Sequence, residues 1–303
     1  MNESIDAISL NFDPGSLLAL NIILGTIMFG IALSLRVSDF ADVAKRPRAP
    51  LIGLFAQFML LPAATWLLTR LLELPPSIAL GMILVAACPG GNISNLVAHL
   101  SRANTALSVS MTAVSTAVAV VMTPLNFSFW GSLSPDTRTV MTDFSLDPLE
   151  MLFNVFILLG IPLVLGMSVR AKFPQLADRA LKPFKVLSIL LFIALVVVAF
   201  QSNFEAFIAV IGVIFVPVAL HNALAWVVGY SAARAAKLPT EDVRAVAIEV
   251  AIQNSGLGLV LIFTFFGGLG GMAVIAGWWG IWHIVTGLII ATIWSRTPDA
   301  SSQ

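Results

Sequence analysis

Long apolar segments alternate with short polar ones along almost the whole chain. A helix that crosses a bilayer needs about 20 mostly apolar residues, so each long segment is a candidate span. The pattern predicts an all-α polytopic membrane protein whose nine transmembrane helices lie near residues 16–36, 49–70, 78–100, 105–128, 149–169, 185–201, 205–232, 243–266 and 271–295. An odd number of spans places the two termini on opposite sides of the membrane.

The composition favours a membrane protein and excludes a soluble globular domain. Hydrophobic residues make up 58% of the chain and charged residues only 11%, whereas soluble domains carry roughly 25% charged residues. The formal net charge is zero, so the lipid bilayer is the expected partner and nucleic acid is not. No obligate protein partner is evident. A single cysteine, Cys88, excludes an intrachain disulfide.

The distribution of lysine and arginine predicts the orientation. If the N-terminal tail, residues 1–15, lies outside, all but two of the 16 basic residues fall on the inner side, the exceptions being Arg70 and Arg138. Basic residues are retained on the cytoplasmic side of membrane proteins. We therefore expect the N-terminus outside and the C-terminal tail, residues 296–303, in the cytoplasm.

Two apolar segments share a pattern that breaks a membrane helix. One is "LPPSIALGMILVAACPGGNISN" from Leu74, and the other is "LPTEDVRAVAIEVAIQNSGLGL" from Leu238. One predicted span descends and the other rises, so spans 1–4 and 6–9 are interpreted as inverted halves with the fifth span between them. Interrupted segments at matching positions of inverted halves are typical of secondary transporters. Chance similarity between apolar stretches is the alternative, and the shared spacing favours the repeat.

Glu249 is the one acidic residue deep within a predicted span. A carboxylate at the bilayer centre costs about 2.5 kcal/mol or more, so a bound cation or a proton must offset it. A protonated carboxyl in a structural hydrogen bond is the alternative. Gln253 shares the helical face of Glu249, and Gln57 offers a further carbonyl oxygen inside an apolar span. Hydroxyl side chains form a stripe along another predicted helix, at Ser108, Thr112 and Thr116.

The two broken segments also carry a resemblance. "CPGGNISN" and "EVAIQNSG" together resemble the paired motifs of the bile acid:sodium symporter family, and "IMFGIALSL", "AQFMLLP" and "ALSVSMTAVST" extend the likeness over roughly residues 17–290. The resemblance implies two broken helices that cross inside a core domain, residues 49–128 and 205–295. This core would pack against a panel domain, residues 16–36 and 149–201. It also implies a bacterial inner membrane.

The resemblance implies two Na⁺ sites that share one carboxylate. The first would use Ser94, Asn95, Ser108, Thr112 and Glu249. The second would use Gln57, Glu249 and Gln253 with the backbone carbonyls of Val250 and Ile252. The expected substrate contacts are Asn92, Asn254 and His283. Asn92 stands where the family usually has threonine, and Ile284 follows His283 where bacterial members often have asparagine, so the substrate surface departs from the family pattern.

The expected function is Na⁺-coupled symport of an organic anion by alternating access, either a bile-acid-like molecule or a small carboxylate such as pantoate. The half-helices after the breaks begin near Ile93 and Ser255, where the helix N-terminus suits an anion. The half-helices before the breaks should end in unpaired carbonyls that suit cations. The leading alternative is a proton-coupled or antiporting relative, such as an arsenite or cation exchanger, in which Glu249 titrates.

A non-transporting receptor of the same architecture is a further alternative, but it would have no need of a full set of oxygen ligands. An enzyme is not expected, because the sequence contains no visible nucleophile–base pair or metal cluster.

Overall fold

The computed structural model describes residues 14–91, 93–144, 148–202 and 204–296. These residues form helices and no strand, which confirms the all-α class. Five of the helical segments are long and apolar enough to cross a membrane, or six if a bent pair counts as one span. The nine spans and the division into core and panel domains stay predictions.

The described residues open with helices α2 (Pro14–Ala32) and α3 (Val37–Lys45), which are bent by 61° relative to each other, counting α2 from Asn21. No span was predicted for residues 37–45. The remaining elements of the first part are α4 (Arg48–Phe55), η1 (Ala56–Leu60), α5 (Leu61–Leu71), α6 (Pro76–Ala87), α7 (Ile93–Leu100), α8 (Thr105–Ser132) and α9 (Pro135–Asp143).

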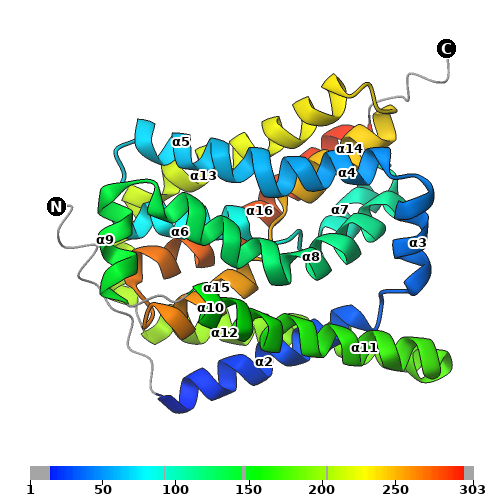
Figure 1. The fold of residues 1–303 in the computed structure, drawn as a ribbon, viewed down its shortest axis with the longest axis horizontal. Helices are drawn as coiled ribbons and strands as arrows, with labels where there is room; N and C mark the ends of the chain where they lie inside the picture. Colours follow the sequence, from blue (N-terminus) through cyan, green and yellow to red (C-terminus); the bar gives the residue numbers. More distant parts are fainter. Residues whose placement is uncertain (1–13, 92, 145–147, 203, 297–303) are drawn as a thin grey trace.

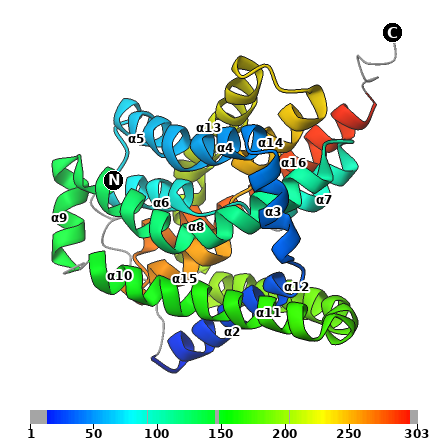
Figure 2. The same cartoon turned by 45° about the vertical axis from the view of Figure 1, so that its right-hand side comes forward.

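The second part continues with α10 (Pro148–Val155), η2 (Phe156–Gly160), α11 (Ile161–Lys172), α12 (Pro174–Ser202), α13 (Phe204–Ala235), α14 (Thr240–Ala251), α15 (Ser255–Phe265) and α16 (Gly270–Ser295). Helix α2 packs against α11 and α12, and these three lie together along one side of the molecule (Figures 1 and 2). Helices α6, α8, α15 and α16 fill its middle, between that group and α4, α5 and α13, and α14 packs against α13.

The half-helices that precede the two breaks have equal lengths. Helices α6 and α14 each have 12 residues, and in each a proline, Pro75 or Pro239, occupies the N-cap position. Proline lacks the backbone N–H that a helix start leaves unbonded, so it is tolerated there. Both half-helices end in extended backbone, at Cys88 and Ile252. Leu-Pro therefore sets the start of each half-helix, and the polar break sets its end.

A π-helical turn interrupts the helix that runs from Arg48 to Leu71. This turn, η1, contains Gln57, and Pro62 follows in the first turn of α5. Since proline cannot donate to the preceding turn, the wider π turn shifts the hydrogen-bond register ahead of it. The second π turn, η2, also precedes a proline, Pro162. Irregular turns of this kind are frequent at functional sites, and Gln57 lies in the first of them.

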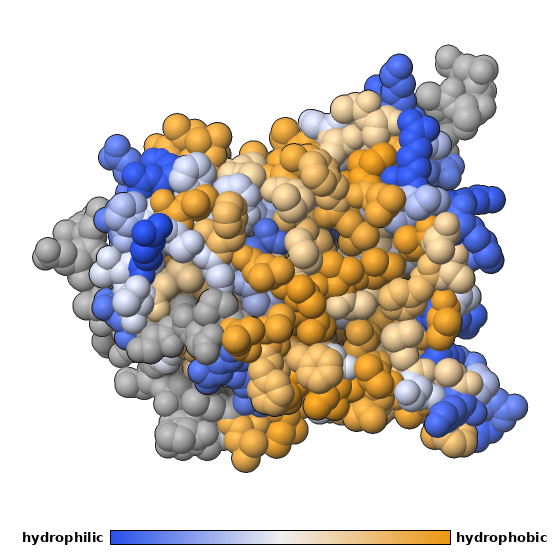
Figure 3. All heavy atoms as spheres, in the orientation of Figure 1, coloured by the Kyte–Doolittle hydropathy of each residue, from blue (hydrophilic) through white to orange (hydrophobic). Residues whose placement is uncertain are grey.

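Apolar side chains cover the outside of the bundle. Leu51, Val164 and Ile289 are each more than half exposed. Figure 3 shows hydrophobic residues in a wide band across one face, with hydrophilic residues gathered at its two ends. A contiguous apolar band of this kind is unfavourable in water and favourable in lipid.

Candidate functional site

The breaks in the two half-helix pairs lie against each other and pair through their backbones. Gly90 and Gln253 form an antiparallel bridge. The Gly91 N–H donates to the Ile252 carbonyl at 2.7 Å, and the Asn254 N–H donates to the Pro89 carbonyl at 2.8 Å. Unpaired backbone groups are costly inside a membrane, and here each break supplies partners for the other.

Two glycines permit this close approach. A Cβ atom on Gly91 would lie 2.9 Å from the carbonyl oxygen of Gln253, which is backbone and cannot move aside. A Cβ atom on Gly90 would collide with the carboxylate of Glu249. The pair Gly90-Gly91 therefore lets the backbone of one break touch both the backbone and the buried acid of the other.

Side chains from other helices cap the carbonyls at the ends of α6 and α14. Thr123 of α8 donates its hydroxyl to the Ala87 carbonyl at 2.7 Å. Asn222 of α13 donates Nδ2 to the Ala251 carbonyl at 2.9 Å. Gln57 donates Nε2 to the Cys88 carbonyl at 2.9 Å. The expectation that these half-helices end in unpaired carbonyls was therefore wrong, because neighbouring helices supply donors. Each carbonyl keeps a second lone pair.

Glu249 is the only acidic residue buried in the part of the chain that the structure describes. Its Oε2 accepts hydrogen bonds from the Ser94 hydroxyl at 2.7 Å and the Thr112 hydroxyl at 3.0 Å. None of the ion pairs found among the described residues includes it. The charge of this carboxylate is therefore met by hydroxyl dipoles and by no cationic side chain.

Asn95 extends this cluster. Its Oδ1 accepts a hydrogen bond from the Ser108 hydroxyl at 2.9 Å and lies 3.3 Å from the Thr112 hydroxyl, whose single proton can go either to Asn95 or to Glu249. All five residues predicted for the first site thus lie in one hydrogen-bonded group. Helices α7, α8 and α14 supply them.

Three of the residues predicted for the second site, Gln57, Gln253 and Val250, form a second hydrogen-bonded group, and no hydrogen bond among the described residues joins it to Glu249. Gln57 donates Nε2 to Gln253 Oε1 at 2.7 Å, and Gln253 donates Nε2 to the Val250 carbonyl at 2.6 Å. The Ile252 carbonyl accepts from Gly91. Gln57 Oε1 is buried and has no hydrogen-bond partner. A buried carbonyl oxygen without a donor is uncommon and points to a ligand or water that would occupy the space before it.

The structure describes two of the three predicted substrate contacts, Asn254 and His283. Asn92 lies outside the described residues. Asn254 caps α15, since its Oδ1 accepts from the Leu257 N–H at 3.1 Å. His283 is buried on α16, and its Nδ1 has no partner. In the described chain no hydrogen bond joins His283 to Asn254, so their shared role in substrate binding stays a prediction.

Sequence reasoning missed several polar residues around the crossing. Ser115 donates to Glu249 Oε1 at 3.5 Å, and Thr286 donates to Asn222 Oδ1 at 2.7 Å. Ser115 follows Thr112 by three residues and therefore lies on the same helical face, a spacing that could have revealed it. Thr116, which the hydroxyl stripe included instead, makes no hydrogen bond to the acid.

The chemistry of this centre suits a hard monovalent cation. Its oxygens come from one carboxylate, hydroxyls, amides and backbone carbonyls, which are the ligands that hard cations prefer. The described residues contain no group of three or more His, Cys, Asp or Glu side chains that could hold a transition metal.

The apolar helices and their buried polar centre define an integral, multi-pass membrane protein. Residues 21–210 match the Sodium Bile acid symporter family. The chain therefore belongs to this family, which was expected from the paired motifs.

Three relatives support the assignment. A sodium-dependent transporter of Bacillus subtilis, itself described as uncharacterised, is 33% identical over 281 residues, 91% of this chain and 83% of that protein. A probable chloroplastic sodium/metabolite cotransporter of Arabidopsis thaliana is 30% identical over 270 residues, covering 89% and 65%. The human ileal sodium/bile acid cotransporter is 30% identical over 243 residues, covering 78% and 67%. Family and relatives indicate sodium-dependent transport, and these relatives are named as transporters rather than enzymes.

Proposed function

We propose that this protein is a Na⁺-coupled symporter of an organic anion and that it works by alternating access. The observation that carries the proposal is the environment of Glu249: a buried carboxylate, hydroxyl donors around it, and no ion-pair partner among the described residues. An uncompensated acid at membrane depth is a functional site by default. A monovalent cation offsets its single charge, and the family supplies Na⁺ as the coupling ion.

The first Na⁺ would bind among Ser94, Asn95, Ser108, Thr112 and Glu249. Support comes from the hydrogen bonds that already join these five side chains. A hydroxyl that donates to a carboxylate can rotate its proton away and offer a lone pair to a cation. The same oxygens therefore serve the ion-free and the ion-bound protein with little movement of the helices.

The second Na⁺ would bind near Gln57, Gln253, Glu249 and the carbonyls of Val250 and Ile252. The unpartnered Oε1 of Gln57 supports this site, because a bound cation would satisfy it. The two carbonyls accept one hydrogen bond each, which leaves a lone pair on each oxygen for an ion. Glu249 would lie between the two sites, so that one carboxylate serves both ions.

The proposed architecture has nine spans in two inverted halves, a core and a panel domain, and the N-terminus outside. The equal lengths of α6 and α14 support the halves. Their caps support them as well, since an amide on the preceding span, Gln57 or Asn222, donates to a carbonyl at the end of each half-helix. The group formed by α2, α11 and α12 supports the panel, because these helices pack on one another.

The substrate is proposed to be an organic anion that binds beside the crossing, with Asn92, Asn254 and His283 as contacts. Helices α7 and α15 begin at the crossing, and each helix N-terminus carries roughly half a positive charge. The printed names of the relatives include bile acid and metabolite cotransporters. Adjacent sites for an anion and for cations would couple their transport, because each ligand lowers the electrostatic cost of the other.

Uptake into proteoliposomes tests the proposal, with a labelled bile acid and a labelled small carboxylate as probes. An inward Na⁺ gradient should drive accumulation of at least one probe, and replacing Na⁺ with K⁺ should abolish it. Glu249→Gln should remove Na⁺ dependence. Glu241→Gln, an exposed acid in the first turn of the same helix, should not. Uptake that a pH gradient drives equally well without Na⁺ would replace this proposal with the proton-coupled alternative.

A further inference from the structure

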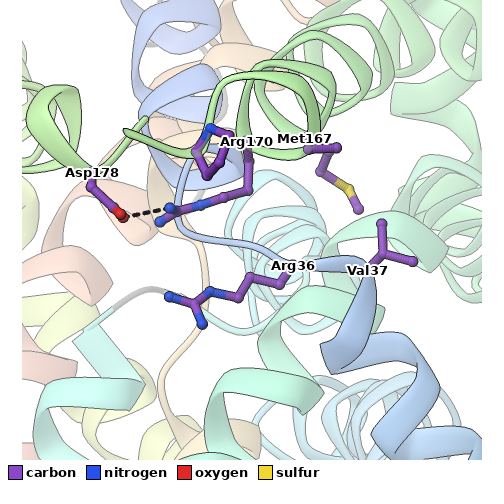
Figure 4. Close-up of a pocket in the computed structure, with 7 residues that line it drawn as sticks. Arg36, Val37, Met167, Arg170 and Asp178 are labelled. Carbon is purple, nitrogen blue, oxygen red and sulfur yellow. Dashed lines mark hydrogen bonds and ion pairs between the residues drawn. The ribbon is translucent and has the colours of Figure 1, made fainter. Parts of the chain in front are cut away.

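A basic cavity lies where α2 turns into α3 and α11 turns into α12. Its volume is about 390 Å³, and its lining consists of Arg36, Val37, Met167, Arg170, Ala171, Pro174 and Asp178 (Figure 4). This volume is within the range of small-molecule sites, roughly 300–1,000 Å³. The cavity is separate from the crossing, because none of the residues assigned to the proposed ion and substrate sites lines it.

The charges around the cavity do not balance. Two guanidinium groups line it, those of Arg36 and Arg170, against the single carboxylate of Asp178. Figure 4 shows the Arg170 side chain extending to Asp178, with the side chain of Arg36 near it. The hydrogen bond and charge of Arg170, together with the charge of Arg36, lower the pKa of Asp178. The three groups therefore interact electrostatically, and together they carry one excess positive charge.

The two arginines differ in how far they are already engaged. Arg170 is 8% exposed, and its Nε donates to the Leu33 carbonyl at 2.8 Å while Nη1 donates to Asp178 Oδ1 at 2.5 Å. Arg36 is exposed, and no residue in the described chain accepts a hydrogen bond from its guanidinium. A fixed, buried cation and a free, exposed one thus line the same cavity, an arrangement that suits an anion with several acceptor oxygens.

Other features of the lining favour the same chemistry. Pro174 is the first residue of α12, so the N-terminus of that helix adjoins the cavity, whereas at the start of α3 the Asp39 carboxylate already accepts from the Arg36 N–H. Helix N-termini attract negative charge. The remaining walls are apolar, formed by Met167 and Ala171. Basic pockets between membrane helices on the side where lysine and arginine gather bind phosphate-bearing head groups.

We propose that this cavity binds a phosphate group between Arg36 and Arg170, carried by an anionic lipid head group or by a soluble phosphate. The bound group would connect the α2–α3 turn to the α11–α12 turn. Arg36 belongs to the link between the first helix and the rest of the bundle, so occupancy would hold that link against α11 and α12.

Purified protein in detergent tests the proposal without any transport measurement. Inorganic phosphate, short-chain phosphatidylglycerol and phosphatidylcholine of the same chain length are titrated at constant ionic strength, and binding is followed by native mass spectrometry and thermal shift. Arg36→Gln should weaken binding about fivefold, the effect of removing an exposed charge pair. Arg46→Gln, an exposed arginine at the end of α3 that does not line the cavity, should leave it unchanged.

Binding of phosphatidylglycerol alone identifies a lipid head group, and binding of inorganic phosphate as well identifies a soluble source; both support the site. Two results would overturn it. One is equal binding of the two lipids with no effect of phosphate. The other is an equal loss in Arg36→Gln and Arg46→Gln, which would mean non-specific attraction to basic residues. Neither result bears on the Na⁺ proposal.

Discussion

Gly90→Ala offers a sharp test of the polar centre, because the three atoms nearest to the added methyl group would all belong to Glu249. A Cβ atom at this position would lie 2.6 Å from the carboxyl carbon Cδ of Glu249 and closer still to Oε1. The backbone itself tolerates alanine, since Gly90 is not among the glycines with positive φ. The methyl group therefore acts by turning the carboxylate away from its present position.

The size of the effect follows from the hydrogen bonds that the carboxylate would give up. Glu249 accepts from Ser94 at 2.7 Å and from Thr112 at 3.0 Å. Hydrogen bonds to a charged group contribute about 1.5–3 kcal/mol each. Losing both costs about 3 kcal/mol or more, which corresponds to at least about a 100-fold loss of Na⁺ affinity if the ion needs the same geometry.

The assay is Na⁺ binding to purified protein, measured by calorimetry and by Na⁺-dependent thermal stabilisation. Gly258→Ala is a matched control near the crossing, because a Cβ there meets its nearest atom, Cys88 Sγ, at an ordinary 3.7 Å. Gly277→Ala, which meets nothing within 4 Å, controls for the glycine-to-alanine change in a helix. Wild-type Na⁺ affinity in Gly90→Ala would refute the reasoning, and so would an equal loss in Gly258→Ala.

Three further predictions concern single side chains. Thr123→Val removes the donor to a buried helix-terminal carbonyl and should lower the free energy of unfolding by about 1–3 kcal/mol. The control Thr292→Val removes an exposed hydroxyl that bonds its own helix, and should change the free energy of unfolding by no more than about 0.5 kcal/mol. Equal melting temperatures of the two variants would contradict this prediction. Ser94→Ala should weaken Na⁺ binding more than Ser115→Ala, because its hydrogen bond to the acid is shorter, 2.7 Å against 3.5 Å; the reverse order in a Na⁺ titration would count against the first site. Asp178 has a lowered pKa, so its ion pair stabilises the protein above the ordinary aspartate pKa of about 4, and this stabilisation is lost as the pH falls further. The difference in melting temperature between wild type and Asp178→Asn should therefore shrink as the pH falls below about 4. A difference that stays constant with pH would disprove the linkage.

The sequence predicted the breaks well because their signals are local. Leu-Pro marks the start of α6 and α14, and the glycine, proline and asparagine residues after them mark where regular hydrogen bonding stops. The bent α3 and the π turn at Gln57 were not predicted. A π turn depends on how a helix adjusts to a proline several residues later, and hydrophobic periodicity does not report that adjustment.

For the candidate site, residue types were easier to predict than their partners. Glu249 could be predicted because a single acidic residue within an apolar span indicates a functional site wherever in the span it lies. Asn222 and Thr123 were missed, because a hydroxyl or amide in a membrane helix often bonds its own backbone, and sequence alone does not reveal the exceptions. Their partners lie 29 and 36 residues away, on another helix, so only the fold identifies them.

The backbone pairing at the crossing has a consequence for how the protein is made. The carbonyl and N–H groups of the break at Pro89–Gly91 find their partners at Ile252–Asn254, more than 150 residues later in synthesis. Glu249, which accepts a hydrogen bond from the Ser94 hydroxyl, is also synthesised more than 150 residues after its partner. Until α14 inserts, water, the insertion machinery or temporary contacts must supply hydrogen-bond partners to the first break, because lipid supplies none to a polar backbone. The contacts that build the proposed ion site therefore also make the first half of the chain dependent on the second during its assembly.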